Sequence, residues 1–100
     1  MLISKQVEGS IIQSLYDSSN VIASQYNTES RNLVVIFDKG GQYLYEGVDH
    51  GDFMKFESSE SQGKSLNTHI KKYSSRKMGV IDTTSIKEDI KSIIEEQRKP

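Results

Sequence analysis

The chain has 100 residues, of which 34% are hydrophobic, and a formal net charge of −1. This length fits one small domain with a modest core. The absence of cysteine excludes disulfides, thiolate metal sites and cysteine nucleophiles. No apolar run reaches the roughly 18 residues that a membrane-spanning helix needs. We therefore expect a cytoplasmic protein without a membrane partner.

The first 17 residues allow two interpretations, and we treat them as an N-terminal extension. Apolar residues recur at every fourth position, which favours a helix: Ile3, Val7, Ile11 and Leu15. Gly9 lies in the middle of this stripe, where it costs about 1 kcal/mol relative to Ala. Two strands joined by a turn at Glu8-Gly9 are the alternative, and the pattern slightly favours the helix.

The next segment predicts a three-stranded antiparallel meander. Residues 21–26 follow a turn cluster and form its first strand. Residues 33–37 are five consecutive apolar residues, as in a strand buried on both faces. Residues 38–41 end in two glycines, which suit a tight hairpin. Tyr43 and Tyr45 then share one face of the third strand, because successive side chains alternate.

Two helices are expected after the meander. Asp49 is placed to cap a short helix that contains Phe53 and Phe56. Residues 58–63 are expected to form a loop. Residues 64–73 predict a second helix, whose apolar stripe would dock on the sheet, and residues 74–80 are expected to be irregular.

The clearest helical pattern lies at the C-terminus, within an appendage over residues 75–100. Ser85 and Glu88 form a capping box. Isoleucines follow at helical spacing: Ile86, Ile90, Ile93 and Ile94. This stripe either completes the core of the domain or packs against a second copy of the chain. Of the two, we expect the second, a homo-oligomer formed through this helix. The fold class is α+β, with the helices packed on one face of the meander and this helix appended.

Charge is unevenly distributed along the chain. Residues 49–60 carry four acids and one lysine, whereas residues 62–78 carry no acid and five basic residues: Lys64, Lys71, Lys72, Arg76 and Lys77. A compact basic segment in an otherwise acidic chain indicates an anionic ligand of limited size.

Four residues of this segment are candidate phosphate or nucleotide contacts. Gly63 and Lys64 open a predicted helix, whose free N–H groups favour an anion. Asn67 and Lys71 lie four residues apart on one helix face, with Lys64 one turn earlier. A flexible turn at Gly63 and a solvated helix face are the alternatives. Position 58 is Ser, where a P-loop requires Gly, so an NTPase motif is not expected.

Three further residues complete the predicted ligand site. Tyr43 and Tyr45 are suited to stack on nucleotide bases, although aromatic residues at this spacing also pack under helices. Arg76 joins them as a further cation of the basic segment. No cofactor is expected, and His50 and His69 alone give no metal site. No motif holds an activated nucleophile beside a base, so an enzyme is not expected.

An ordered set of residues is similar to the KTSC domain family: Ser18-Ser19-Asn20-Val21-Ile22, Tyr26, Leu33-x-Val35-x-Phe37, Gly41, Tyr43-x-Tyr45, Val48, Phe53 and Ser61-x-Gly63-Lys64-x-x-Asn67-x-x-Ile70. The resemblance covers about residues 18–74, which we take as the domain. That family is named after a C-terminal domain of some lysyl-tRNA synthetases and includes small stand-alone bacterial and phage proteins. The resemblance implies RNA binding or binding of nucleotide signals, and favours Lys64 and Asn67 as contacts. It implies no enzymatic activity.

We therefore expect a non-catalytic binding protein for a small phosphate-bearing nucleotide. A cyclic oligonucleotide signal, sequestered by a phage-encoded protein in the host cytoplasm, is one form of this hypothesis. An RNA-binding module of the tRNA type is the alternative, although the net charge argues against it. A protein–protein adaptor acting through the C-terminal helix is the second alternative.

Overall fold

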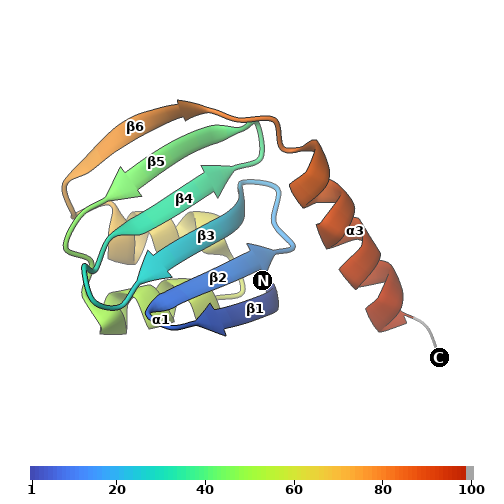
Figure 1. The fold of residues 1–100 in the computed structure, drawn as a ribbon, viewed down its shortest axis with the longest axis horizontal. Helices are drawn as coiled ribbons and strands as arrows, with labels where there is room; N and C mark the ends of the chain where they lie inside the picture. The colour runs from blue at the N-terminus through green and yellow to red at the C-terminus, as the bar shows by residue number, and fades with distance from the viewer. Residues whose placement is uncertain (99–100) are drawn as a thin grey trace.

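The computed structural model describes residues 1–98, and residues 99 and 100 of the predicted appendage lie outside the described part. Its elements follow one another along the chain as β1 (Leu2–Glu8), β2 (Ile11–Tyr16), β3 (Val21–Asn27), β4 (Leu33–Phe37), β5 (Gly41–Tyr45), α1 (His50–Ser58), α2 (Gln62–Ser65), the π-helix η1 (Leu66–Ile70), β6 (Ser75–Val80) and α3 (Thr84–Arg98). The strands form one antiparallel sheet in the order β1-β2-β3-β4-β5-β6 (Figure 1).

The α+β class is confirmed, but the sheet has six strands where the sequence predicted three. The predicted meander is β3, β4 and β5, and its hairpin turns at Gly40, which has a φ of 95°. The favoured helix over residues 1–17 is wrong, because this segment forms the hairpin β1–β2, which turns at Gly9 with a φ of 60°. The irregular segment predicted over residues 74–80 is also wrong, since it contains β6.

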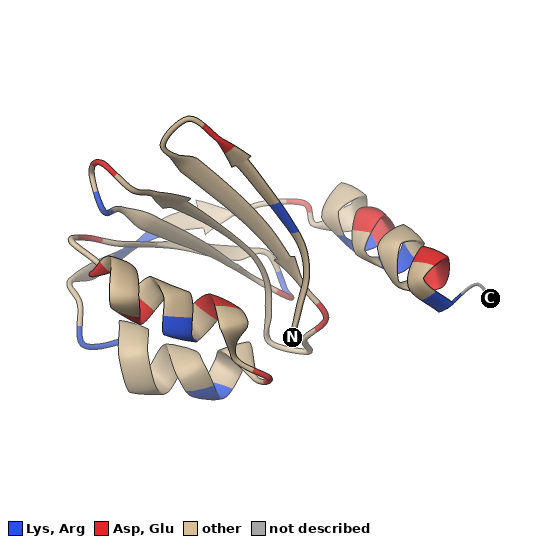
Figure 2. Cartoon of the chain, turned by 90° about the horizontal axis from the view of Figure 1, so that it is seen from below, with Lys and Arg blue, Asp and Glu red and all other residues tan. Residues whose placement is uncertain are grey.

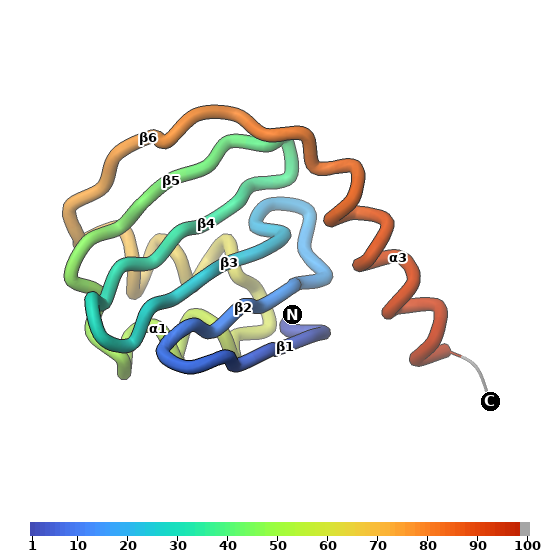
Figure 3. The backbone as a smooth tube through the Cα atoms, viewed as in Figure 1, coloured from blue at the N-terminus to red at the C-terminus, as the bar shows by residue number. Residues whose placement is uncertain are grey.

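The core lies between the sheet and the helical segments α1, α2 and η1, which cover one face of it (Figures 1 and 3). It is built from buried apolar and aromatic side chains of both layers: Tyr16, Val21, Tyr26, Leu33, Val35, Tyr45, Val48, Phe53, Phe56, Leu66 and Ile70. Tyr26 stacks on Phe53 with ring centroids 4.3 Å apart, and its hydroxyl donates to the Val48 carbonyl at 2.6 Å. A tyrosine can be fully buried here because its polar atom has a partner.

Local chemistry predicts the start of α1 but not the starts of the later helices, and α3 begins at Thr84, one residue before Ser85 of the predicted capping box. Asp49 caps α1 as expected, because its carboxylate accepts the Gly51 N–H at 3.0 Å. The second helix starts at Gln62, two residues before its predicted start, and is capped by the Ser61 hydroxyl. It continues as a π-helix, in which the Lys71 N–H donates to the Leu66 carbonyl at 2.9 Å, and ends at Ile70.

The predicted C-terminal helix is confirmed as α3, and it packs loosely. None of its described residues is buried, and its isoleucines are half-buried. A gap of about 380 Å³ separates it from the outer face of β1 and β2, between Leu15 and Ile93. Figure 2 shows α3 apart from the other helices, with acidic and basic residues along its length.

Among residues 1–98, no helix is long and apolar enough to cross a membrane.

Candidate ligand pocket

A pocket of about 490 Å³ opens beside the C-terminal half of the sheet. Its lining comes from four places in the fold: the end of β4 (Phe37), β5 (Tyr43 and Tyr45), the residue after η1 (Lys71) and the start of β6 (Ser75). The volume lies within the usual range for small-molecule sites. Three residues predicted from the sequence, the two tyrosines and Lys71, are therefore brought together.

Aromatic rings form one wall of this pocket. Tyr43 and Tyr45 pair with Val35 and Leu33 of β4, so both point to the face of the sheet that carries the core. Tyr43 meets the Phe37 ring edge-on, with centroids 5.5 Å apart and planes at 85°. Both of these rings are half-buried, which leaves part of each available to a ligand.

The two phenol groups have hydrogen-bonding capacity to spare. Within residues 1–98, neither phenol makes a hydrogen bond to another protein group. Every buried side-chain oxygen of these residues has a hydrogen-bond partner, so the two phenol oxygens are not fully buried and reach solvent. Burial, followed by the proximity of Tyr43, raises the pKa of Tyr45. The Tyr45 phenol is therefore a neutral donor at physiological pH.

Lys71 and its neighbour Lys72 differ in their electrostatic environment. The Lys72 ammonium lies 3.0 Å from the carboxylate of Asp52, whereas Lys71 has no carboxylate partner among the described residues. No acidic residue lines the pocket either. Lys71 is therefore the cation that a ligand at this wall can use.

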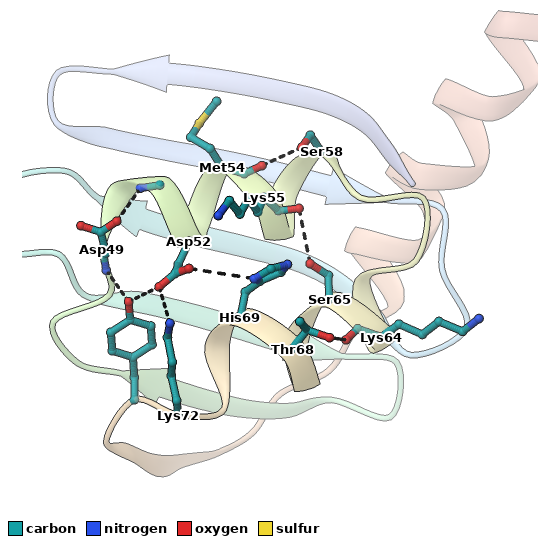
Figure 4. Close-up of polar contacts among 12 residues, drawn as sticks. Asp49, Asp52, Met54, Lys55, Ser58, Lys64, Ser65, Thr68, His69 and Lys72 are labelled. Atoms are coloured by element: carbon teal, nitrogen blue, oxygen red, sulfur yellow. Dashed lines mark hydrogen bonds and ion pairs between the residues drawn. The ribbon is translucent and has the colours of Figure 1, made fainter.

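Asp52 of α1 contacts His69 and Lys72 (Figure 4), which lie before and after Lys71 in the chain. Its carboxylate accepts a hydrogen bond from the Tyr73 hydroxyl and lies 3.9 Å from Nδ1 of His69. The Tyr73 oxygen in turn accepts the Asp49 N–H at 3.1 Å. The hydrogen bond from Tyr73, and then that from Lys72, lowers the pKa of Asp52. These contacts hold the chain against α1 on either side of Lys71.

Strand β6 supplies a cation that the sequence analysis did not select. Ser75 and Lys77 pair with Tyr45 and Tyr43, so their side chains share the pocket face of the sheet. Arg76 pairs with Leu44 and points to the opposite face. The structure therefore separates Arg76, a predicted site residue, from the pocket. If residues 75–80 had been predicted as a strand, the alternation of its side chains would have indicated Lys77 as the ligand contact in place of Arg76.

The remaining predicted site residues lie on α2 and η1, outside the pocket lining. A Cβ on Gly63 would lie 2.8 Å from Nδ2 of Asn20, so glycine allows the loop before β3 to approach closely. The Lys64 N–H is taken up by the Ser61 hydroxyl at 3.4 Å. Lys64 and Asn67 are exposed, and the Lys64 side chain points away from Asp52 and His69 (Figure 4). A phosphate contact at these three residues stays a prediction.

Neither histidine belongs to a metal-binding cluster of the described residues. Among residues 1–98, no group of three or more His, Cys, Asp or Glu side chains is placed to hold a metal ion. His50 stacks on Tyr26 with centroids 5.9 Å apart, and His69 faces Asp52.

The fold and the pocket define a small α+β domain with an aromatic, cationic cavity beside an antiparallel meander. The model of the KTSC domain family matches residues 17–73, more than half of the chain. The chain therefore belongs to the KTSC domain family.

A solved structure supports this assignment. The crystal structure of a KTSC domain protein from Yersinia pestis is similar to this chain at 30% sequence identity and a TM-score of 0.64. The similarity covers 69% of this chain and 99% of the Yersinia protein. A search among curated proteins found no match.

The residues that carry the family resemblance serve mainly the architecture. Most of the apolar ones lie in the core: Val21, Tyr26, Leu33, Val35, Tyr45, Val48, Phe53 and Ile70. Phe37 and Tyr43 are different, because they are half-buried and line the pocket. Phe37 was not selected from the sequence, where it reads as the last residue of a buried strand.

Proposed function

We propose that this chain is a non-catalytic binding protein for a small phosphate-bearing nucleotide, held in the pocket beside β5. The observation that carries the proposal is the composition of the lining among the described residues: three aromatic rings, one serine hydroxyl and one lysine without an ion-pair partner, and no acid. Aromatic rings stack on any base, and an unpaired ammonium in an acid-free site favours a phosphate.

The pocket suggests how such a ligand would lie. The base would rest on the exposed parts of the Phe37 and Tyr43 rings, since these two are the less buried aromatic side chains. The phosphate would meet Lys71, with the Ser75 hydroxyl beside it as a further donor. The Tyr45 phenol lies at the pocket as a neutral donor for a base or ribose oxygen.

The same features favour a small ligand over a long RNA. A net charge of −1 gives little non-specific attraction to a polyanion. The described pocket is also a single cavity of about 490 Å³, suited to one nucleotide unit at a time. A cyclic oligonucleotide, whose units could be held by pockets of different copies, is the specific form of ligand that we would test first.

The experiment is a thermal-shift panel on the purified chain, followed by calorimetry. The panel holds nucleosides, mononucleotides, cyclic di- and trinucleotides and short RNAs. A ligand present at 100 times its Kd should stabilise the fold by about 2.7 kcal/mol, a rise of several degrees in Tm. We expect a small nucleotide to give this rise and Lys71→Gln to reduce it. A rise with RNA only, weakening steeply with salt, would replace the proposal with RNA binding. A flat panel would refute both forms.

A further inference from the structure

The pocket face carries a second unpaired lysine, which lies at a different place along the aromatic wall. Lys77 stands opposite Tyr43, and Ser75, two residues earlier on β6, stands opposite Tyr45. Ser75 lines the pocket together with Lys71. Two residues along a strand span about 7 Å. Lys71 lies on the turn that leads into Ser75, and Lys77 lies two residues beyond Ser75 along β6, so the two cations come from different places beside the pocket.

Neither cation has an ion-pair partner among residues 1–98. Among residues 1–98, the lysines with a carboxylate within ion-pair distance are Lys5, Lys72 and Lys87. Lys71 and Lys77 have no such partner. Two separated ammonium groups without ion-pair partners among the described residues favour a ligand with two separated negative charges over a ligand with one.

We infer that the ligand is a nucleotide unit with phosphates on both its 3′ and 5′ oxygens, one held by Lys71 and the other by Lys77. This inference rests on the proposed nucleotide pocket and names the ligand class. The base lies on the Tyr43 ring, next to the strand position of Lys77. Such a unit is what every residue of a 3′–5′-linked cyclic oligonucleotide presents, and also every internal residue of a short 3′–5′-linked linear one. A mononucleotide satisfies only one lysine.

The test is isothermal titration calorimetry with adenosine 3′,5′-bisphosphate, adenosine 3′-monophosphate and adenosine 5′-monophosphate, with the guanosine series in parallel. We expect the bisphosphate of one series to bind at least tenfold more tightly than either monophosphate, because it adds a charge-assisted contact. Lys71→Gln and Lys77→Gln should each weaken the bisphosphate about tenfold. Each variant should also weaken the binding of only one of the two monophosphates: Lys71→Gln should affect one of them and Lys77→Gln the other.

Lys91→Gln is the matched control, since Lys91 is an exposed lysine of α3 without an ion-pair partner among the described residues. It should leave all three affinities unchanged. Equal affinities for bisphosphate and monophosphate, or no effect of Lys77→Gln, would overturn the inference while leaving the nucleotide pocket intact. Failure of all nucleotides to bind would instead overturn the proposed function itself.

Cyclic and linear oligonucleotides, which both contain such a nucleotide unit, are then compared directly. Cyclic dinucleotides and linear dinucleotides with a 5′-phosphate are titrated under the same conditions. Tighter binding of the cyclic form would assign the site to a closed signal molecule, and tighter binding of the linear form would assign it to an RNA end. Both outcomes support the pair of phosphate contacts. Loss of affinity in both, relative to the monophosphate, would contradict it.

Discussion

The hydroxyl of Ser14 donates a hydrogen bond of 2.6 Å to the carboxylate of Glu57, whose side chain is only 2% exposed. The ammonium of Lys5 lies 2.9 Å from the other oxygen of the same carboxylate. Both partners come from the hairpin β1–β2, whereas Glu57 belongs to α1, inside the residues that match the family. The hairpin therefore completes the polar environment of a buried charge in the family domain.

The variant Ser14→Ala should destabilise the fold. It would leave one oxygen of a buried carboxylate without its donor, which costs about 2 kcal/mol for a hydrogen bond to a charged group. In a domain of this size we expect a fall in Tm of roughly 10 °C. Chemical denaturation and calorimetry measure both quantities. Ser74→Ala is the control, because Ser74 is exposed and its hydroxyl has no hydrogen bond among the described residues. Equal stability of the two variants would show that β1–β2 contributes little to holding Glu57.

Asp52 predicts how stability depends on pH. The Tyr73 hydroxyl, and then Lys72, lowers its pKa from the ordinary value of 3.8. A carboxyl whose pKa is lower in the folded state stabilises the fold above its unfolded-state pKa, and this contribution is lost as pH falls through the folded-state pKa. The wild type should therefore be more stable than Asp52→Asn from pH 5 upward. The difference should shrink below about pH 4.

Urea titrations of both proteins between pH 2 and pH 7 measure this difference. Asp89→Asn is the control, since Asp89 is an exposed carboxylate of α3 without an ion pair among residues 1–98. Its stability should stay parallel to that of the wild type across the range. A difference between wild type and Asp52→Asn that does not change with pH would show that the carboxylate acts through its shape and not through its charge.

Sequence reasoning predicted the parts of this fold whose patterns are local. The apolar run of β4, the glycine turn before β5, the Asp49 cap and the isoleucine stripe of α3 each depend on a few neighbouring residues. The hairpin β1–β2 was the less favoured of two alternatives, because its inward positions include Lys5 and Ser14, which are polar. Their partner, Glu57, is distant in sequence, so no local alternation reveals the strand.

Only those parts of the candidate site that depend on local patterns were predicted from the sequence. Tyr43 and Tyr45 were placed on one face by simple alternation, and that placement is confirmed. Strand β6 has exposed residues at almost every position and exists through its pairing with β5, so its own sequence does not identify it. Without the strand, Arg76 and Lys77 cannot be assigned to opposite faces. The sequence therefore identified the basic segment and Lys71, but it selected Arg76 where the structure has Lys77 on the pocket face.

The aromatic wall predicts a graded response at Tyr43. Tyr43→Phe keeps the ring against Phe37 and should bind the nucleotide identified by the panel within about threefold of wild type. Tyr43→Leu removes the stacking surface, which is worth about 1–3 kcal/mol per base, and should weaken binding about tenfold or more. Calorimetry well below the Tm of each variant measures Kd without interference from unfolding. Equal losses in the two variants would show that the phenol oxygen matters and the ring does not.

The two cations Lys71 and Arg76 distinguish the pocket from the opposite face of the sheet. Both were predicted from the sequence as ligand contacts, but only Lys71 lines the pocket, and Arg76 pairs with Leu44 on the other face. Lys71→Gln should therefore raise Kd about tenfold, while Arg76→Gln should leave it unchanged. Lys64→Gln is a third variant to measure, because a loss of affinity in it would assign the phosphate to the start of α2. If Arg76→Gln weakens binding and Lys71→Gln does not, the ligand lies on the outer face of the sheet, and the pocket beside β5 is not the site.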